Sequence, residues 1–427
     1  MQVFALMVSA IVLARTLGPE GLGIVAIVMA AVRVAVIPAQ EGAVKLSERE
    51  LAGALGKSDR AQALSALKFS IFAALFVFTM GLGLVYAFLK QTTLTDDSVQ
   101  FNAVVIAATA ILVAAIANSV LKGVLRGLGQ TVTAVRLSNL ITLSIPLMYL
   151  MWIWLVEPLT PAVALWINAF CRVAYLPLLT LVARRSWSLV PRPGSEAESM
   201  KIPRQWYFES VQFTVLGVIT IALMEVSTLI LASVSTPEEV GWFRIASRVF
   251  VVTGFVTYAA QSAFGPRIAF TWQAGNEDAL ERPARMISTM ALIFSLVFVV
   301  LFALFGEWAV SAVFGSEFEE AFFPALIMSV AGVSLSLSAT SGKLLKMTGE
   351  QTTVIYGSAV GLLIAIGLNL QLAPDHGAVG SAIALLVALP TAQVIYVWGV
   401  KRHLGFRPLP SVESARALLN RFRKALG

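Results

Sequence analysis

Long apolar runs, each separated from the next by a short polar cluster, extend along almost the whole chain. The first six lie at about 3–16, 22–44, 68–89, 101–121, 137–156 and 162–183, and a second six lie at about 206–234, 241–263, 286–305, 321–342, 353–372 and 377–400. A helix of about 20 residues crosses the roughly 30 Å hydrocarbon core of a bilayer. Because the runs are continuous and do not alternate with period two, they predict transmembrane helices and exclude a porin-like barrel.

The composition agrees with this pattern. Of the 427 residues, 58% are hydrophobic and 13% are charged, and the mean hydropathy is +0.83. A soluble domain has about 25% charged residues. We therefore expect an all-α integral membrane protein with about 12 transmembrane helices. The single Cys171 excludes an intrachain disulfide, and His376 and His403 are isolated, so we expect no metal site and no catalytic set.

One polar turn occurs twice. The segment LGPEGLG at 17–23 returns 218 residues later as STPEEVG at 235–241, and in both copies a Pro and a Glu precede the next apolar run. This chemistry is typical of a helix start. The predicted structural turns are at Gly18, Pro19, Gly23, Pro237 and Gly241. Two further pairs, GKSD at 56–59 with GNED at 275–278 and RGLGQ at 126–130 with KMTGE at 346–350, share nearly the same offset. The sequence thus predicts two parallel six-helix lobes related by an internal repeat.

The predicted lobes are residues 1–183 and 206–400, joined by a polar linker at 184–205 and followed by a basic tail at 401–427. Lys and Arg concentrate in the linker, the tail and the loops after the even-numbered runs, to which we assign Lys122 and Arg126. By the positive-inside rule these regions are cytoplasmic. This placement accounts for the net charge of +7 without a nucleic acid partner. The tail has the pattern of a basic amphipathic helix on the membrane surface.

The first apolar run is too short for a comfortable span, at about 14 residues, whereas its counterpart before Pro237 has nearly 30. We expect the first helix to be truncated, with roughly a dozen residues missing, judging from the repeat. A cleaved signal peptide is the alternative, although neither Lys nor Arg precedes the run.

Charged residues inside the apolar runs are the candidate functional residues, because an Arg at the bilayer centre costs roughly 2.5–3.5 kcal/mol on insertion scales. Four arginines qualify: Arg33, Arg172, Arg244 and Arg248. Arg33 and Arg172 lie in the middle of their runs, and one acid, Glu225, lies equally deep. Since Arg33 and Arg248 are on equivalent helices, we expect them to flank a shared cavity that binds a phosphate or diphosphate.

Structural roles remain open for several of these residues. Arg248 could instead pair with Glu225, which lies at similar depth on the preceding helix. Arg172 has Asn168 one turn away and Tyr175 beyond it, so a structural role there is as plausible as ligand contact. We interpret the serines at 334, 338 and 341 as helix-packing contacts or interhelical hydrogen bonds.

The segment ARTLGPEGLG at 14–23 resembles the first loop of the oligosaccharide flippases, the Wzx-like polysaccharide transporters of the MOP (MATE-like) superfamily. The six-plus-six layout, the charged loop after the second helix and the RGLG elbow agree with this resemblance. It implies that two lobes carry an undecaprenyl-diphosphate-linked oligosaccharide from the inner to the outer leaflet of the bacterial cytoplasmic membrane by alternating access. The glycan would be a repeat unit of lipopolysaccharide O-antigen, exopolysaccharide or capsule.

The resemblance implies no cofactor, with coupling to protons, sodium or the membrane potential, for which Glu225 is the candidate residue. The expected partners are the lipid-linked oligosaccharide, membrane lipids, a polysaccharide polymerase and other glycan-assembly proteins. A MATE-like drug or cation antiporter is an alternative, but it generally needs intramembrane carboxylates. A membrane-embedded glycan polymerase or ligase is the alternative of another class. We expect a transporter and not an enzyme.

The orientation can be tested at the linker. Alkaline phosphatase fused after Ser195 is expected to be inactive, because the basic linker should stay in the cytoplasm. The same fusion after Glu317, in a predicted outward loop, is expected to be active. An active fusion at Ser195 would overturn the orientation.

Overall fold

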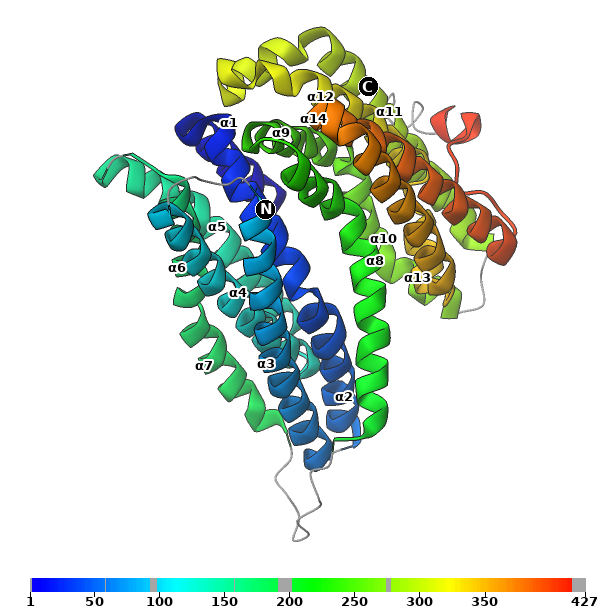
Figure 1. Ribbon diagram of the computed structural model, residues 1–427. Helices are drawn as coiled ribbons and strands as arrows, with labels where there is room; N and C mark the ends of the chain where they lie inside the picture. Colours follow the sequence, from blue (N-terminus) through cyan, green and yellow to red (C-terminus); the bar gives the residue numbers. More distant parts are fainter. Residues whose placement is uncertain are drawn as a thin grey trace. The chain divides into compact units, whose positions relative to one another are not determined.

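The computed structural model describes residues 2–57, 59–92, 98–156, 158–190, 202–273 and 278–416. The chain forms two compact units, Met1–Glu225 and Val226–Gly427. The described residues are helical almost throughout and contain no strand, so the predicted all-α fold is confirmed (Figure 1). The predicted boundaries at 183 and 206 stay a prediction, and much of the predicted linker lies outside the described residues.

Unit 1 contains seven numbered α-helices and the first part of an eighth. They are α1 (Gln2–Ile37), the π-helix η1 (Pro38–Ala43), α2 (Val44–Lys57), α3 (Arg60–Gln91), α4 (Ser98–Gly127), α5 (Thr131–Leu155), α6 (Pro161–Ala174), α7 (Leu176–Ser186), the 3-10 turn η2 (Trp187–Leu189) and the start of α8 (Arg204–Val234). Helix α4 is central, because it contacts α1, α2, α3, α5, α6 and α7.

Unit 2 begins within α8. Its other elements are α9 (Pro237–Thr253), α10 (Phe255–Gln273), α11 (Asp278–Phe314), the 3-10 helix η3 (Ser316–Ala321), α12 (Phe322–Leu337), α13 (Ser341–Met347) and α14 (Gln351–Leu404). Helix α12 is central here and contacts α9, α10, α11, η3 and α14. Since α4 and α12 carry the fourth and tenth predicted spans, the fourth helix of each half organises its unit.

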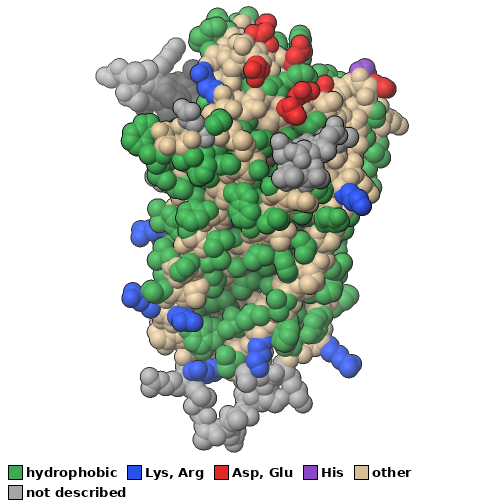
Figure 2. All heavy atoms as spheres, turned by 60° about the vertical axis from the view of Figure 1, so that its left-hand side comes forward, with side chains coloured by type: hydrophobic (Ala, Val, Ile, Leu, Met, Phe, Trp, Pro, Cys, Tyr) green, Lys and Arg blue, Asp and Glu red, His purple; other side chains and the backbone are tan. Residues whose placement is uncertain are grey.

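The lengths and surfaces of the helices suit a membrane. Among the described residues, eight helices are long and apolar enough to cross one, or up to ten if each of two bent pairs is one span. The two longest, Phe4–Leu55 and Gln351–Leu404, have 52 and 54 residues, and at 1.5 Å per residue each extends about 80 Å, enough for two crossings. The number of 12 spans stays a prediction. Hydrophobic side chains are widespread on the face shown in Figure 2, as lipid-facing helices require.

Two glycines interrupt these longest helices. Gly18 has φ 65° and Gly377 has φ 51°, a region that favours glycine because it has no Cβ. Pro19 follows Gly18 directly, so the helix restarts where Pro is tolerated. The helix break at Gly18 lies within the segment 17–23, and the remaining residues of that segment are helical. Its second copy is also a helix start: Thr236 caps α9 and Pro237 is its first residue.

The two copies of this turn contact equivalent helices. A Cβ on Gly21 would lie 3.4 Å from Cγ of Pro161, the first residue of α6. At the matching position of unit 2, the Glu239 carboxylate accepts a hydrogen bond of 2.6 Å from the backbone N–H of Ala378, just after the Gly377 break. Each turn thus packs on the start of the last span in its own half.

The elbow after α4 is also repeated in detail. Gly129 has φ 78° and Gly349 has φ 93°. The residues that follow, Gln130 (φ −90°, ψ 41°) and Glu350 (φ −88°, ψ 43°), cap the next helices with nearly identical backbone angles. These angles agree with the repeat predicted from RGLGQ and KMTGE.

Three predicted spans contain breaks that the apolar pattern did not indicate. The sixth splits into α6 and α7 at Tyr175, the eighth into α9 and α10 at Gly254, and the tenth ends at Leu337 before α13. Apolar residues continue across each break, so hydropathy cannot locate it. The ninth span is also longer than predicted, because α11 reaches Phe314.

Two glycines let α4 approach α2 closely. A Cβ on Gly127 would lie 2.7 Å from Cβ of Leu51 and 3.1 Å from the carbonyl oxygen of Glu48, and Gly123 lies against Val44 in the same way. Small residues one turn apart allow such backbone contact in membrane helices. This contact places the acidic Glu48 beside α4.

The tail begins with ordered contacts to α11. Ser288 donates to the carbonyl of Pro408 at 2.8 Å, and the N–H of Ser411 donates to Thr289 Oγ1 at 3.2 Å. A helix starts at Val412, but residues 417–427 lie outside the described residues. The predicted amphipathic tail helix therefore stays a prediction.

The glycine contact gives a stability test. Gly127→Ala is expected to destabilise the protein by about 1–3 kcal/mol, because the backbone oxygen of Glu48 cannot move aside easily. Gly83→Ala on α3 is the matched control, since nothing lies within 4 Å of its Cβ position, and it should be neutral or slightly stabilising. Thermal unfolding in detergent measures both, and equal midpoints would contradict the close packing.

Candidate functional site

The deep arginine of α1 is held by an acid of α8. Arg33 is half-buried and forms an ion pair with Glu225, whose side chain is 10% exposed. Both residues belong to unit 1, where Glu225 is the last residue. The predicted deep positions of Arg33 and Glu225 are thus brought together by the fold.

Close packing joins the first part of α8 to α1 and η1. A Cβ on Gly217 would lie 2.5 Å from Cγ of Glu41 and 3.3 Å from the side chain of Ile37, and one on Gly42 would lie 2.8 Å from the carbonyl of Ser210. The chain can turn from α1 into η1 here because Pro38, which lacks an N–H, begins the π-helix. The first part of α8 therefore lies directly against α1 and η1.

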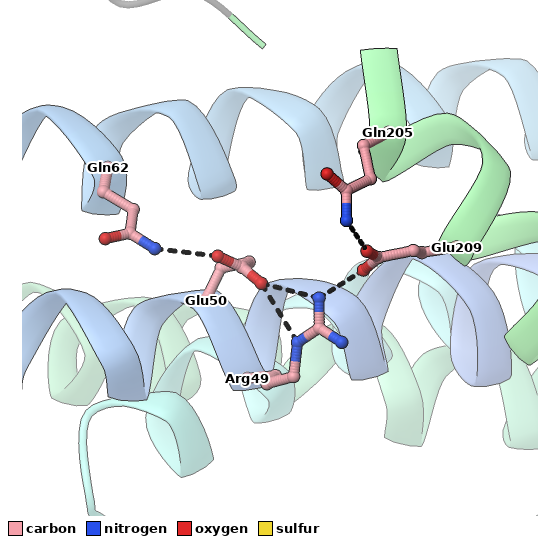
Figure 3. A network of polar contacts seen from close by, with 5 residues as sticks. All are labelled: Arg49, Glu50, Gln62, Gln205 and Glu209. Atoms are coloured by element: carbon pink, nitrogen blue, oxygen red, sulfur yellow. Dashed lines mark hydrogen bonds and ion pairs between the residues drawn. The ribbon is translucent and has the colours of Figure 1, made fainter. Parts of the chain in front are cut away.

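A polar network fixes the other end of the same contact (Figure 3). Arg49 of α2 forms ion pairs with Glu50, at 2.8 Å, and with Glu209 of α8. Gln62 of α3 donates to Glu50 at 2.7 Å, and Gln205 donates to Glu209 at 2.6 Å. Because Arg49 is half exposed, each ion pair stabilises weakly. Together they link α2, α3 and α8 at the end of unit 1 that is predicted to be cytoplasmic.

Arg172 lies beside the break in the sixth span. It is in the last turn of α6, two residues before Ala174 ends that helix, and close to the middle of the candidate span Pro161–Ser186. Asn118 of α4 donates to the Arg172 carbonyl at 3.0 Å. The side-chain amide of Asn168 donates to the Tyr149 hydroxyl and to the Ala164 carbonyl. The Nε atom of Arg172 is buried without a hydrogen-bond partner in the described structure.

Lys122 and Arg126 were both predicted to lie in a cytoplasmic loop, but both lie inside α4. Lys122 is half-buried there. It follows Asn118 by one turn and precedes Arg126 by one turn, so the three share one face of the helix. This spacing of four was visible in the sequence and is the signal that could have located it.

Four basic side chains form a row in unit 1, which we call the basic row: Arg126, Lys122, Arg172 and Arg33. The charges of Arg126 and Arg172 both act on Lys122, and the charge of Arg33 acts on Arg172. An acidic residue lies at each end of the row. Oε2 of Glu48 lies 3.8 Å from Nη1 of Arg126, and Glu225 forms an ion pair with Arg33. Among the described residues, Lys122 and Arg172 have no carboxylate partner.

The corresponding joint of unit 2 is neutral. Ser338, which aligns with Asn118 by the repeat, bonds to Gln393 of α14 at 2.6 Å. Gln393 in turn aligns with Arg172, and Tyr396 aligns with Tyr175. The same pair of helices is therefore joined in both units, through the cationic Arg172 in unit 1 and the neutral Gln393 in unit 2. The packing role predicted for Ser338 is confirmed.

The remaining arginines lie in unit 2. Arg244 and Arg248 are one turn apart on α9 and are both half-buried. The expected cavity shared by Arg33 and Arg248, and the alternative pairing of Arg248 with Glu225, each involve residues of both units and stay predictions. In the described part of the chain no three His, Cys, Asp or Glu residues could hold a metal ion.

Solved structures with this architecture are transporters. An inward-facing multidrug resistance MATE family transporter of the MOP superfamily matches with a TM-score of 0.73 and 15% identity, covering 94% of each chain. The lipid II flippase MurJ in an inward closed conformation matches with a TM-score of 0.69 and 10% identity, and the match covers 94% of this chain and 86% of MurJ. A MOP superfamily transporter from Pyrococcus furiosus matches with a TM-score of 0.60 and 14% identity, and the match covers 94% of this chain and 92% of the transporter. At these identities the likeness shows the fold alone.

A comparison with curated proteins finds no match. The sequence profile described as polysaccharide biosynthesis protein matches residues 2–272, which is more than half of the chain. The family resemblance inferred from the first loop is thereby confirmed. The chain belongs to the polysaccharide biosynthesis protein family.

Proposed function

We propose that this protein is a flippase that moves a lipid-linked oligosaccharide, carried on undecaprenyl diphosphate, between the leaflets of a membrane. Membership of the polysaccharide biosynthesis family and the MOP fold support a transporter in glycan assembly. The basic row carries the choice of substrate. Half-buried guanidinium groups bind phosphate oxygens in bidentate geometry, and a lipid-linked sugar brings its diphosphate to the protein within the membrane.

In this mechanism Arg33 exchanges partners. Glu225 neutralises it in the empty protein, since an unpaired charge within the bilayer is costly. A diphosphate that replaces Glu225 keeps Arg33 neutralised, so binding requires no net exposure of charge. The polyprenyl chain stays in the lipid beside the helices, and Arg172, Arg244 and Arg248 are further candidates for contact with the anion. Alternating access then delivers the headgroup to the other leaflet.

The antiporter alternative is less well supported. Exchange of a cationic drug for protons or sodium needs a carboxylate that can bind the cation, and Glu225 is the deep acid available in the predicted spans. Its carboxylate is already engaged by Arg33, and the row around it is basic. An anionic substrate therefore fits unit 1 better than a cationic one.

The remaining parts of the proposal concern location and partners. We place the protein in the bacterial cytoplasmic membrane with its C-terminus in the cytoplasm, on the distribution of Lys and Arg. Coupling to protons, sodium or the membrane potential would supply direction. A polysaccharide polymerase and other glycan-assembly proteins are the proposed partners.

Three variants test the role of Arg33. Arg33→Gln is expected to abolish surface glycan in a strain whose own gene is deleted, and to cause the lipid-linked intermediate to accumulate. Glu225→Gln should retain export, because the diphosphate replaces that carboxylate. The double variant Arg33→Gln/Glu225→Gln restores charge balance and should fold, but it should remain inactive.

The double variant separates ligand binding from charge pairing. If Arg33 served solely to neutralise Glu225, removing both charges would restore export. Surface glycan at the wild-type level in the double variant would therefore sink the assignment. Membrane abundance and elution as a single folded species, checked for each variant, exclude loss of the protein as the cause.

A further inference from the structure

Lys122 and Arg172 lie in the middle of the basic row. We propose that they form an anion-binding subsite within unit 1, between the α4–α5 turn and Arg33, that receives the diphosphate of the substrate. The nature of the carrier lipid rests on the proposed function. The existence of a diphosphate site at these two residues does not.

The joint between α4 and α6 builds this subsite. Asn118 donates to the Arg172 carbonyl at 3.0 Å and to the Ala114 carbonyl at 2.7 Å, so one amide holds the end of α6 against α4. Lys122 lies one turn further along the same face of α4. The close packing of Gly123 and Gly127 on α2 fixes the opposite side of the helix. The helices that carry the two cations are therefore joined directly at this point.

Structural roles do not explain Lys122. A basic residue in the last turn of a helix is favoured by the helix dipole, and this accounts for Arg172 in α6 and Arg126 in α4. Lys122 lies one turn before the end of α4, half-buried, with Arg126 and Arg172 acting on its charge. Gathering like charges in a partly buried place is unfavourable, and a bound anion removes the repulsion.

The charge of the subsite matches its proposed ligand. Glu48 and Glu225 compensate the two ends of the row, so Lys122 and Arg172 leave two positive charges in the middle. A diphosphate that links a lipid to a sugar carries two negative charges. The buried Nε atom of Arg172, which has no hydrogen-bond partner in the described structure, is a donor available to it. The neutral Gln393 at the equivalent joint of unit 2 argues that the fold alone does not need the cation.

Binding to the purified full-length protein tests the proposal. The probes are inorganic diphosphate in detergent, and nanodiscs containing either undecaprenyl diphosphate or phosphatidylglycerol. Lys122→Gln and Arg172→Gln are each expected to weaken binding of both diphosphate probes by about tenfold or more. Lys68→Gln, which removes an exposed Lys of α3 in the same unit, is the matched control and should bind as the wild type does.

Thermal unfolding provides a second measurement. Diphosphate should raise the unfolding temperature of the wild type and of Lys68→Gln, but not that of Lys122→Gln. Without ligand, Lys122→Gln should unfold at the wild-type temperature or above it, because one repulsive charge is gone. A folded Lys122→Gln protein with wild-type affinity for diphosphate would overturn the subsite. Dependence of phosphatidylglycerol binding alone on Lys122 would overturn it too.

The outcomes distinguish this subsite from the proposed function. If diphosphate binding depends on Lys122 and Arg172 while export does not depend on Arg33, the subsite stands and the flippase mechanism fails. If binding and export depend on Arg33 but not on Lys122, the subsite fails and the mechanism stands.

Discussion

The cost of placing charge in hydrocarbon is the constraint on which this structure depends. The protein meets it by pairing charges within one unit, as Arg33 does with Glu225, and by joining other charges in polar networks, as around Arg49. Lys122 and Arg172 are exceptions, since neither has a carboxylate partner among the described residues. The closely packed helices around them keep these two cations near each other. Because the repulsion between the cations is unfavourable, the basic row is informative about the substrate.

Much of the fold could be predicted because its signals are local. Pro19 and Gly18 specify a helix break through their own backbone chemistry, and the same holds for the elbow at Gly129, so the repeat could be read from short segments. The breaks at Tyr175 and Gly254 were not predicted, since apolar residues continue through them. Pro177 in the first turn of α7 is a local signal for the first of these breaks, but hydropathy does not record it.

The candidate site also has features that the sequence predicts and features that depend on how the helices pack. The depth of Arg33 follows from its position in an apolar run, but its pairing with Glu225 joins residues 192 apart and depends on how α8 packs. Lys122 was missed because a Lys after an apolar run resembles the start of a loop. The helix in fact continues to Gly127, and the regular spacing of Asn118, Lys122 and Arg126 would have indicated this.

The joint between the fourth and sixth spans occurs twice in the chain, with Asn118 and Arg172 in one unit and Ser338 and Gln393 in the other. Unit 2 thus serves as an internal comparison for unit 1, because it joins the same two helices with a neutral residue in place of Arg172. Folding and chemistry are separable at this joint. Substitutions there can change what unit 1 recognises while leaving its helices in place, which is the condition under which one transporter scaffold can acquire different substrates.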